Sequence, residues 1–131
     1  MSAQKRKDTA PELALRSRLH RMGLRYRTHV PPLPALRRRA DIVFGPARVA
    51  VFVDGCFWHG CPEHGRRRHD VNSWYWPDKI ARNQRRDADT DLQLRAAGWA
   101  VVRVWEHEDG DRVAARVAAL VRDRRHQMAA T

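Results

Sequence analysis

The sequence predicts one α/β domain in which a mixed β-sheet is flanked by helices. Three observations lead to this class. The chain has 131 residues, the size of one ordinary domain. Short apolar runs typical of strands alternate with longer segments of helical period. No linker or internal repeat divides residues 1–131, so we expect a single domain with the order helix, three strands, helix, strand, helix.

The first predicted helix begins with residues 9–12 (TAPE), which have the S/T-x-x-E form of a capping box. Apolar residues then recur at helical spacing until Gly23, which ends the element. Residues 24–30 are predicted to be a strand, and a proline-rich loop with the basic run 37–39 follows. Capping alone would account for Glu12.

Residues 40–44 and 48–53 are predicted strands around residues 45–47 (GPA), a hairpin signature. The turn folds the strands back, so Asp41 and Asp54 should lie near the same end, in a register that the turn decides. Mg²⁺ needs only one or two carboxylates besides water and substrate phosphate. Taken singly, Asp41 is better explained as a strand-edge charge and Asp54 as a turn residue. Together they favour a metal site.

The second half of the chain contains a long loop, a helix, a strand and a last helix. Residues 55–77 have no regular period, and loops of that length in compact domains are usually functional or disordered. Residues 78–97 are predicted to be a helix closed by Gly98, and residues 99–105 the last core strand. An amphipathic C-terminal helix is marked by four apolar residues, namely Val113, Val117, Leu120 and Val121.

The charge balance points to a polyanionic partner. Lys plus Arg number 26 against 15 Asp plus Glu, a net charge of +11, and only three of the basic residues are lysines. Arginine binds phosphate through a planar fork, so this composition points to nucleic acid. A GC-rich genome would also favour arginine over lysine, but it does not explain the net charge.

The sequence has no apolar stretch near the ~20 residues of a membrane span. Residues 1–8, which we expect to be a flexible basic arm, lack the apolar segment of a signal peptide. These features predict a cytoplasmic protein, in which a disulfide would be unusual.

The loop that follows the strand 48–53 contains the spacing of a zinc site. Cys56, Cys61 and His64 have a C-x4-C-x2-H pattern, which is not that of a zinc finger. Structural zinc takes four ligands. By position His107, after the last strand, is the best distant fourth ligand, and His69 is its competitor. Free buried thiols are the alternative.

His59 follows Asp54 closely, and a neutral imidazole near phosphate can act as a general base at neutral pH. A further zinc ligand or a plain loop histidine is the alternative. Asp87 lies seven residues from both Ile80 and Leu94, so it shares their apolar helix face. A carboxylate there needs a partner. Orienting His59 would supply one, and a salt bridge to an arginine explains the position equally well.

Aromatic residues crowd the same loop, as Phe57 and Trp58 and again at residues 74–76 (WYW). Wedge side chains inserted between base steps unstack DNA, and aromatic rings also stack on unpaired bases. Covering the core is the alternative for Trp74 and Trp76.

Seven parts of the chain match a known protein family: residues 41–44 (DIVF), 51–62 (VFVDGCFWHGCP), Trp76, 79–83 (KIARN), Asp87, 98–99 (GW) and 104–106 (VWE). With these segments the chain resembles the very-short-patch-repair (Vsr) DNA mismatch endonucleases. The resemblance runs from about Lys7 to about Val121, and its GCFWH core is highly specific. The resemblance implies a restriction-endonuclease-like, PD-(D/E)xK-type fold and Mg²⁺-dependent nicking of DNA beside a T:G mismatch, with a structural Zn²⁺ stabilising the loop 55–77.

The resemblance also implies residue roles. Asp41 would bind Mg²⁺ together with the Val53 carbonyl, His59 would activate water with Asp87 as its partner, and Glu12 would hold metal-bound water. The implied DNA-intercalating residues are Phe57, Trp58 and Trp76. The implied zinc ligands are Cys56, Cys61, His64 and His107.

Two departures bear on T:G specificity. The best-known members carry a histidine where this chain has Asp54, which alters the second proton-handling position and offers the metal another ligand. The arm before Glu12 is short, and in the family that segment helps to grip DNA.

The predicted function is therefore nicking of one strand at or beside a T:G mismatch in very short patch repair. The predicted partner is mismatched double-stranded DNA in a bacterial cytoplasm, bound by a monomer without membrane contact. One alternative is a non-catalytic, zinc-stabilised module that binds distorted DNA, and another is a general nickase without mismatch specificity. The enzyme requires Asp41 and His59 to converge, whereas the module needs only zinc, arginines and tryptophans.

Overall fold

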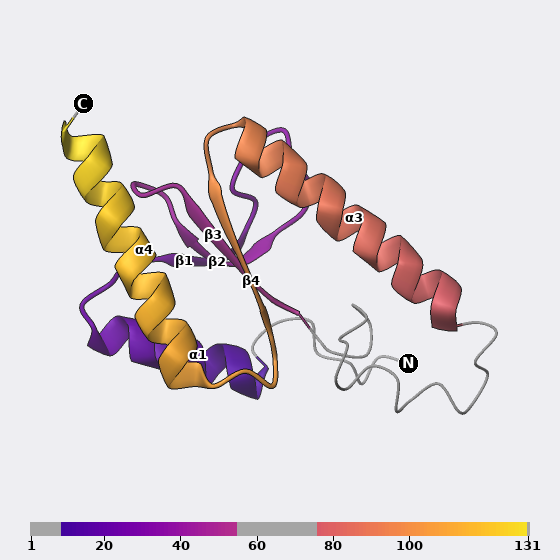
Figure 1. Cartoon of the computed structure of the whole chain (residues 1–131), viewed down its shortest axis with the longest axis horizontal. Coiled ribbons are helices and arrows are strands. Elements are labelled where there is room, and N and C mark those ends of the chain that lie inside the picture. The colour runs from indigo at the N-terminus through magenta and orange to yellow at the C-terminus, as the bar shows by residue number, and fades with distance from the viewer. Residues whose placement is uncertain (1–8, 55–75, 131) are drawn as a thin grey trace.

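A computed structural model of the chain describes residues 9–54 and 76–130 (Figure 1). Within these residues the predicted order of elements is confirmed. The elements are α1 (Ala10–Arg21), β1 (Arg27–Val30), β2 (Ala40–Phe44), β3 (Val49–Asp54), α3 (Trp76–Ala96), β4 (Ala100–Trp105) and α4 (Gly110–Ala130). The predicted zinc and aromatic loop lies almost wholly outside the described residues.

The strands form a four-stranded mixed sheet in the order β1-β2-β3-β4. β2 pairs antiparallel with both β1 and β3, as the predicted hairpin requires. β4 pairs parallel with β3, with Asp54 opposite Trp105. Parallel neighbours need a long crossover connection, and α3 belongs to it. The mixed sheet flanked by helices is therefore confirmed.

The helices cover the two faces of this sheet unequally. α1 and α4 lie together on one face, and α3 lies on the other (Figure 1). The larger core lies on the α1/α4 side, where alternate strand residues pack against both helices. The sheet contributes Ile42, Phe44, Val49, Val51, Val102 and Val104, and the two helices contribute Leu15, Leu19, Val113, Val117 and Val121. A smaller core lies on the α3 side and contains Val43, Ala50, Phe52 and Leu94.

Two glycines end helices as the sequence predicted. Gly23 follows α1 with a φ of 85°, and the Leu24 N–H donates to the Leu19 carbonyl at 3.1 Å. Gly98 follows α3 with a φ of 88°, and the Trp99 N–H donates to the Leu94 carbonyl at 2.9 Å. This is the Schellman motif, which glycine favours because it has no Cβ. It also explains why β1 begins later than predicted, since Leu24 belongs to the helix end.

The predicted capping box is wrong. Thr9 is the N-cap residue of α1, but its side chain makes no capping hydrogen bond. Glu12 instead turns into the protein, where it is 1% exposed and accepts a hydrogen bond from Arg16 Nη1 at 2.9 Å. A buried carboxylate needs charged or hydrogen-bonding neighbours. Glu12 therefore belongs to the interior rather than to the surface of the first helical turn.

Candidate active site

Three side chains from three elements converge at one end of the sheet: Glu12 of α1, His29 of β1 and Asp41 of β2. One potential ligand atom from each lies within 4.8 Å of the other two. His29 Nε2 is 2.7 Å from Glu12 Oε2, and His29 Nδ1 is 3.7 Å from Asp41 Oδ1. Carboxylate oxygens and an imidazole nitrogen are common ligands of divalent cations.

The β1–β2 register explains how His29 reaches this position. Thr28 pairs with Ile42 and Val30 with Ala40, so His29 lies opposite Asp41. His29 has a φ of 55°, in the left-handed region that few non-glycine residues adopt. Such a backbone costs on the order of 1–3 kcal/mol and is concentrated at functional sites. The strain coincides here with the approach of His29 to two carboxylates.

Asp41 is held by the backbone of the neighbouring strand and is mostly buried. The Val53 N–H donates to Asp41 Oδ2 at 2.7 Å. Burial raises the pKa of Asp41 to about 7, and the charges of Glu12 and Asp54 add to the rise. The hydrogen bond from Val53 and the charge of Arg103 oppose it. A nearby cation would favour the ionised carboxylate, so the electrostatics of Asp41 suit a metal ligand.

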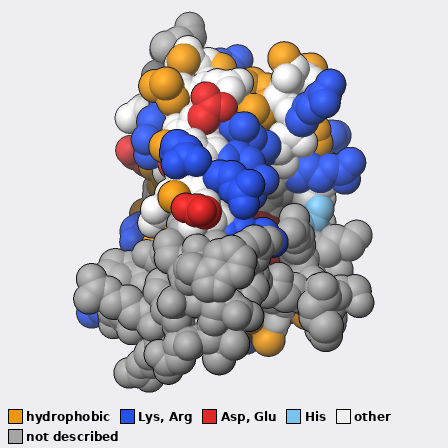
Figure 2. Space-filling model, turned by 90° about the vertical axis from the view of Figure 1, so that its right-hand side faces the viewer, with side chains coloured by type: hydrophobic (Ala, Val, Ile, Leu, Met, Phe, Trp, Pro, Cys, Tyr) orange, Lys and Arg blue, Asp and Glu red, His pale blue; other side chains and the backbone are white. Residues whose placement is uncertain are grey.

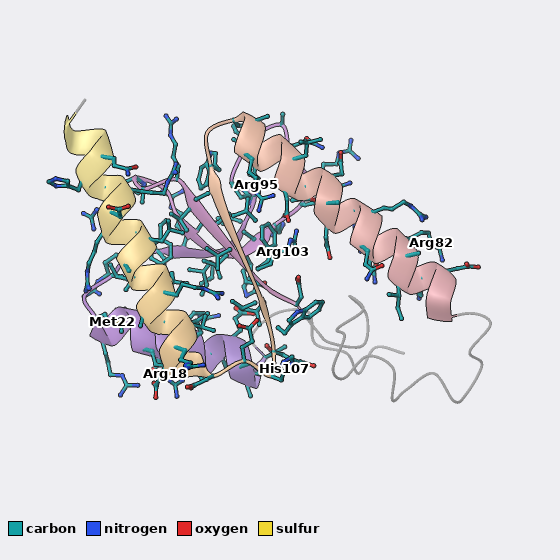
Figure 3. The ribbon with its side chains drawn as sticks, viewed as in Figure 1. Arg18, Met22, Arg82, Arg95, Arg103 and His107 are labelled. Carbon is teal, nitrogen blue, oxygen red and sulfur yellow. The ribbon has the colours of Figure 1, made fainter. Side chains whose placement is uncertain are left out.

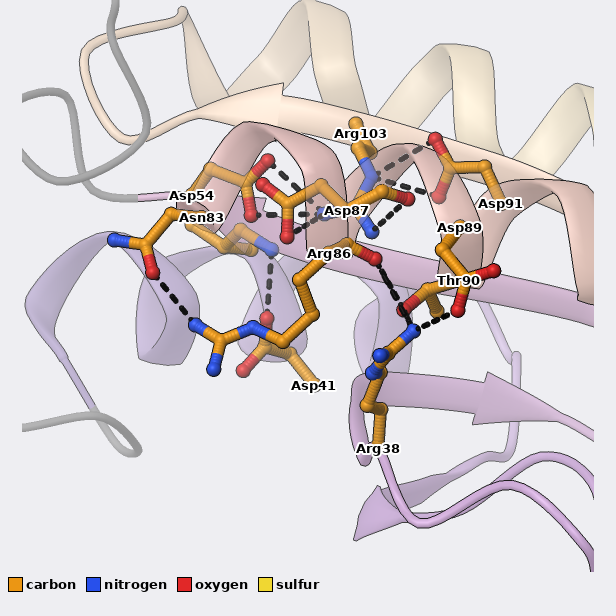
Figure 4. Close-up of polar contacts among 11 residues, drawn as sticks. Arg38, Asp41, Asp54, Asn83, Arg86, Asp87, Asp89, Thr90, Asp91 and Arg103 are labelled. Carbon is orange, nitrogen blue, oxygen red and sulfur yellow. Dashed lines mark hydrogen bonds and ion pairs between the residues drawn. The ribbon is translucent and has the colours of Figure 1, made fainter. Parts of the chain in front are cut away.

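A second group of charges centres on Arg103 of β4 (Figures 3 and 4). Arg103 Nη1 lies 3.2 Å from both carboxylate oxygens of Asp54, which is 7% exposed. Arg103 Nε donates to Asp91 at 2.8 and 3.0 Å, and Nη1 lies 3.6 Å from Asp87 Oδ1. The guanidinium stacks over the Phe52 ring, 4.2 Å from its centroid. One arginine therefore joins β3, β4 and α3.

The predicted residues in the described part of the chain separate into these two groups. Asp41 and Glu12 belong to the first group. Asp54 does lie at the same hairpin end as Asp41, but its carboxylate contacts Arg103. Asp87 shares the inward face of α3 as predicted, and its contact with Arg103 is the salt bridge that the sequence left open as an alternative. Val53 contributes its N–H to Asp41.

His107 is exposed and follows the end of β4. Because β3 and β4 run parallel with Asp54 opposite Trp105, Asp54 lies at the end of the sheet that His107 follows. The side chain of Trp76, at the start of α3, is not described. The remaining predicted site residues and the competitor lie outside the described residues: Cys56, Phe57, Trp58, His59, Cys61, His64 and His69.

Sequence reasoning missed His29 and Arg103. His29 carried a usable signal, because it is a lone histidine in a short predicted strand that ends directly before Pro31. Arg103 carried a stronger one, since it interrupts the apolar run of residues 100–105 (AVVRVW). A charge within a core strand needs buried partners, and α3 was the element available to supply them.

Basic side chains gather on the side of the molecule where α3 lies (Figure 2). α3 carries exposed arginines, namely Arg82, Arg85, Arg86 and Arg95. The basic run 37–39 is tied to the same helix, because Arg38 Nη1 donates to Asp89 at 2.7 Å and to Thr90 at 2.8 Å. Exposed Arg37 and Arg39 therefore flank an anchored residue. In the described part of the chain, no helix has a stretch long and apolar enough to cross a bilayer.

Comparison with known proteins identifies the family. The family described as DNA mismatch endonuclease Vsr matches residues 1–64. The type II nicking enzyme V.NaeI of Lentzea aerocolonigenes is 49% identical over 123 residues, which cover 92% of this chain and 74% of that protein. V.XorIIP of Xanthomonas oryzae pv. oryzae, also named a type II nicking enzyme, is 42% identical over 85% of this chain and 79% of its own length.

The DNA mismatch endonuclease Vsr of Escherichia coli is 35% identical over 106 residues, which cover 81% of this chain and 66% of that protein. The similarity to V.NaeI covers 92% of this chain, which is enough to include both groups of charged residues described above. The chain belongs to the Vsr endonuclease family.

Proposed function

We propose that this chain is a metal-dependent DNA endonuclease that nicks one strand at or beside a T:G mismatch in very short patch repair. The convergence of buried Glu12 with the partly buried His29 and Asp41 is the observation that carries the proposal. Relatives named nicking enzymes and mismatch endonuclease support the reaction. The mixed sheet, with Asp41 near the open end of its central hairpin, supports assignment to the restriction-endonuclease-like fold.

Glu12, His29 and Asp41 would hold the catalytic cation, with the Val53 carbonyl as a further ligand. Their donor atoms fit a divalent ion, because the two carboxylates suit Mg²⁺ and Mn²⁺ and an imidazole nitrogen is a ligand for transition-metal ions. The proton affinity of Asp41 near neutral pH fits as well, since a cation would stabilise its ionised form. When bound, Mg²⁺ supplies Lewis-acid stabilisation of charge on the phosphate.

The other residues would handle water and DNA. His59, five residues after Asp54, is the proposed base that takes the proton of the attacking water. Exposed arginines on α3 and in the run 37–39 would bind phosphates without regard to sequence. Phe57, Trp58 and Trp76 would wedge between base steps, at an unstacking cost of a few kcal/mol. A mismatched step costs less to open, which gives mismatch preference.

The nicking prediction compares T:G and fully paired duplexes at fixed salt with Mg²⁺, with and without chelator. We expect faster nicking of the T:G duplex, because its stacking and pairing are already weakened. Trp58→Ala should reduce this preference more than total binding, since the arginines supply the phosphate contacts.

Three results would redirect the proposal. Equal rates for wild type on both duplexes would identify a general nickase. Binding of distorted DNA without nicking would identify the non-catalytic module. Nicking that is unaffected by chelator would remove the metal from the mechanism.

The zinc prediction concerns Cys56, Cys61, His64 and His107. We expect one tightly bound Zn²⁺ per chain, with Zn–S distances near ~2.3 Å. Its removal should lower the thermal stability before it affects chemistry, because structural metal binding contributes to folding. Elemental analysis and X-ray absorption of protein purified without chelator provide the measurement. His107→Ala should lose the ion and His69→Ala should keep it, and the opposite result would make His69 the fourth ligand.

A further inference from the structure

Among the described residues, Arg103 has three carboxylates around it. Its guanidinium faces three carboxylates, Asp54 on β3 and Asp87 and Asp91 on α3. The side chain is 20% exposed, so these contacts are only partly screened by water. Removing these charges from water costs free energy, which their mutual attraction offsets only with good geometry.

The sheet register places this group beside the proposed metal site. The β2–β3 pairing puts Asp41 opposite Phe52, and the β3–β4 pairing puts Arg103 opposite Phe52 on the other side. Successive strand residues alternate between faces, so Asp54 shares the face of Phe52. Asp54 is thus a diagonal neighbour of Asp41, and its charge contributes to the raised pKa of Asp41.

Among the described groups, Arg103 and a cation at Asp41 would compete for the Asp54 carboxylate. This carboxylate can stay with Arg103, as observed at 3.2 Å, or turn toward a cation at Asp41. The stacking of Arg103 on Phe52 and its bonds to Asp91 fix the guanidinium from other directions. This anchoring favours the contact between Arg103 and Asp54, because an arginine side chain that is already fixed loses little more conformational entropy when it binds Asp54.

We propose that Arg103 is a positioning residue that holds Asp54 away from the proposed metal site, so that Glu12, His29 and Asp41 bind the cation without a further carboxylate. The inference rests on the proposed function. Ligand charge tunes the affinity of cation sites. Freeing Asp54 would therefore tighten metal binding. It would also slow nicking, because Asp54 and Asp87 would lose their fixed positions.

The test is Mn²⁺ binding measured by calorimetry, without DNA, on zinc-containing protein in magnesium-free buffer. Arg103→Met removes the charge but keeps a long side chain over Phe52. We expect it to bind Mn²⁺ more tightly, on the order of tenfold. Adding Asp54→Asn to that variant should return the affinity to within about twofold of wild type. Asp54→Asn alone should change the affinity little.

Arg38→Met is the matched control, because Arg38 also bonds α3 but through Asp89 and Thr90. It should leave Mn²⁺ affinity unchanged even if stability falls. Arg103→Gln is the second variant if Arg103→Met does not fold, and it carries the same expectation. Unchanged or weaker Mn²⁺ binding in the Arg103 variant, or a gain that survives Asp54→Asn, would overturn the inference.

Failure of the inference is separable from failure of the proposed function. If wild type binds Mn²⁺ and nicks DNA while the Arg103 variant shows no gain, only the role of Arg103 is wrong. If wild type binds Mn²⁺ but cuts no duplex, the proposed function is wrong, and the calorimetric comparison still decides the role of Arg103. If wild type binds no Mn²⁺ without DNA, the inference is wrong, and the nicking assay with and without chelator still decides the proposed function.

Discussion

Asp41→Ala is expected to reduce nicking by on the order of a thousandfold or more while leaving DNA binding nearly unchanged. Loss of a metal-holding carboxylate removes transition-state stabilisation worth several kcal/mol, and each ~1.4 kcal/mol is a factor of ten in rate. Asp41 is mostly buried, at 16% side-chain exposure, so it contributes little to the exposed surface that meets phosphates. Its loss should therefore affect chemistry rather than affinity.

The measurement pairs single-turnover nicking of a T:G duplex with equilibrium binding at the same salt. Asp123→Ala is the matched control, since Asp123 is exposed on α4. It should cut at the wild-type rate. Excess Mn²⁺ should rescue Asp41→Ala only weakly, because Glu12 and His29 alone would bind the cation less tightly than the full set of ligands. Near wild-type cutting by Asp41→Ala would show that the reaction takes place elsewhere.

The second large effect is on stability and its dependence on pH. The pKa of Asp41 is raised from 3.8 to about 7, with burial as the main cause. Between these values the folded protein binds more protons at Asp41 than the unfolded chain does. Stability without the catalytic metal should therefore fall as pH rises from about 4 through about 7, and the loss is complete above the folded pKa.

Asp41→Asn removes this penalty, because the amide stays neutral and its oxygen can still accept the Val53 N–H. At pH 8 the variant should be more stable than wild type by on the order of 4 kcal/mol, from a shift of about three pKa units. The gain should shrink toward zero near pH 4. Urea unfolding of both proteins across this range, in magnesium-free buffer, is the measurement.

Adding a divalent cation to wild type and to Asp41→Asn provides the control for this stability prediction. Saturating Mg²⁺ or Mn²⁺ should stabilise wild type at pH 8 and stabilise Asp41→Asn much less, because binding to the folded state alone adds to its stability. Parallel stability curves for the two proteins would mean that Asp41 is already compensated in the folded protein, and that no cation is needed to keep it ionised.

Local sequence patterns were enough to predict the elements. Gly23 and Gly98 mark helix ends because a left-handed residue closes the Schellman motif, and this depends on only a few neighbouring residues. The hairpin around residues 45–47 brings Asp41 and Asp54 to one end, since a short turn leaves little choice. Helical spacing likewise placed Asp87 on the inward face of α3.

The family could also be recognised from local sequence patterns. The residues that carry the resemblance, above all the GCFWH core, are continuous in the chain and need no folding to be read. The predicted roles of the loop residues, His59 and the zinc ligands among them, stay predictions, because these residues lie outside the part of the chain that the structure describes.

Only the tertiary structure decided which charges meet. Glu12 had the sequence context of a helix cap, yet it lies against His29, seventeen positions away in the sequence. Asp54 looked like a partner of Asp41, yet its carboxylate contacts Arg103 from another strand. These pairings depend on strand register and on the packing of α1 and α3 against the sheet. A local pattern specifies the period and ends of an element, whereas the partner of a buried charge depends on which elements the core brings together.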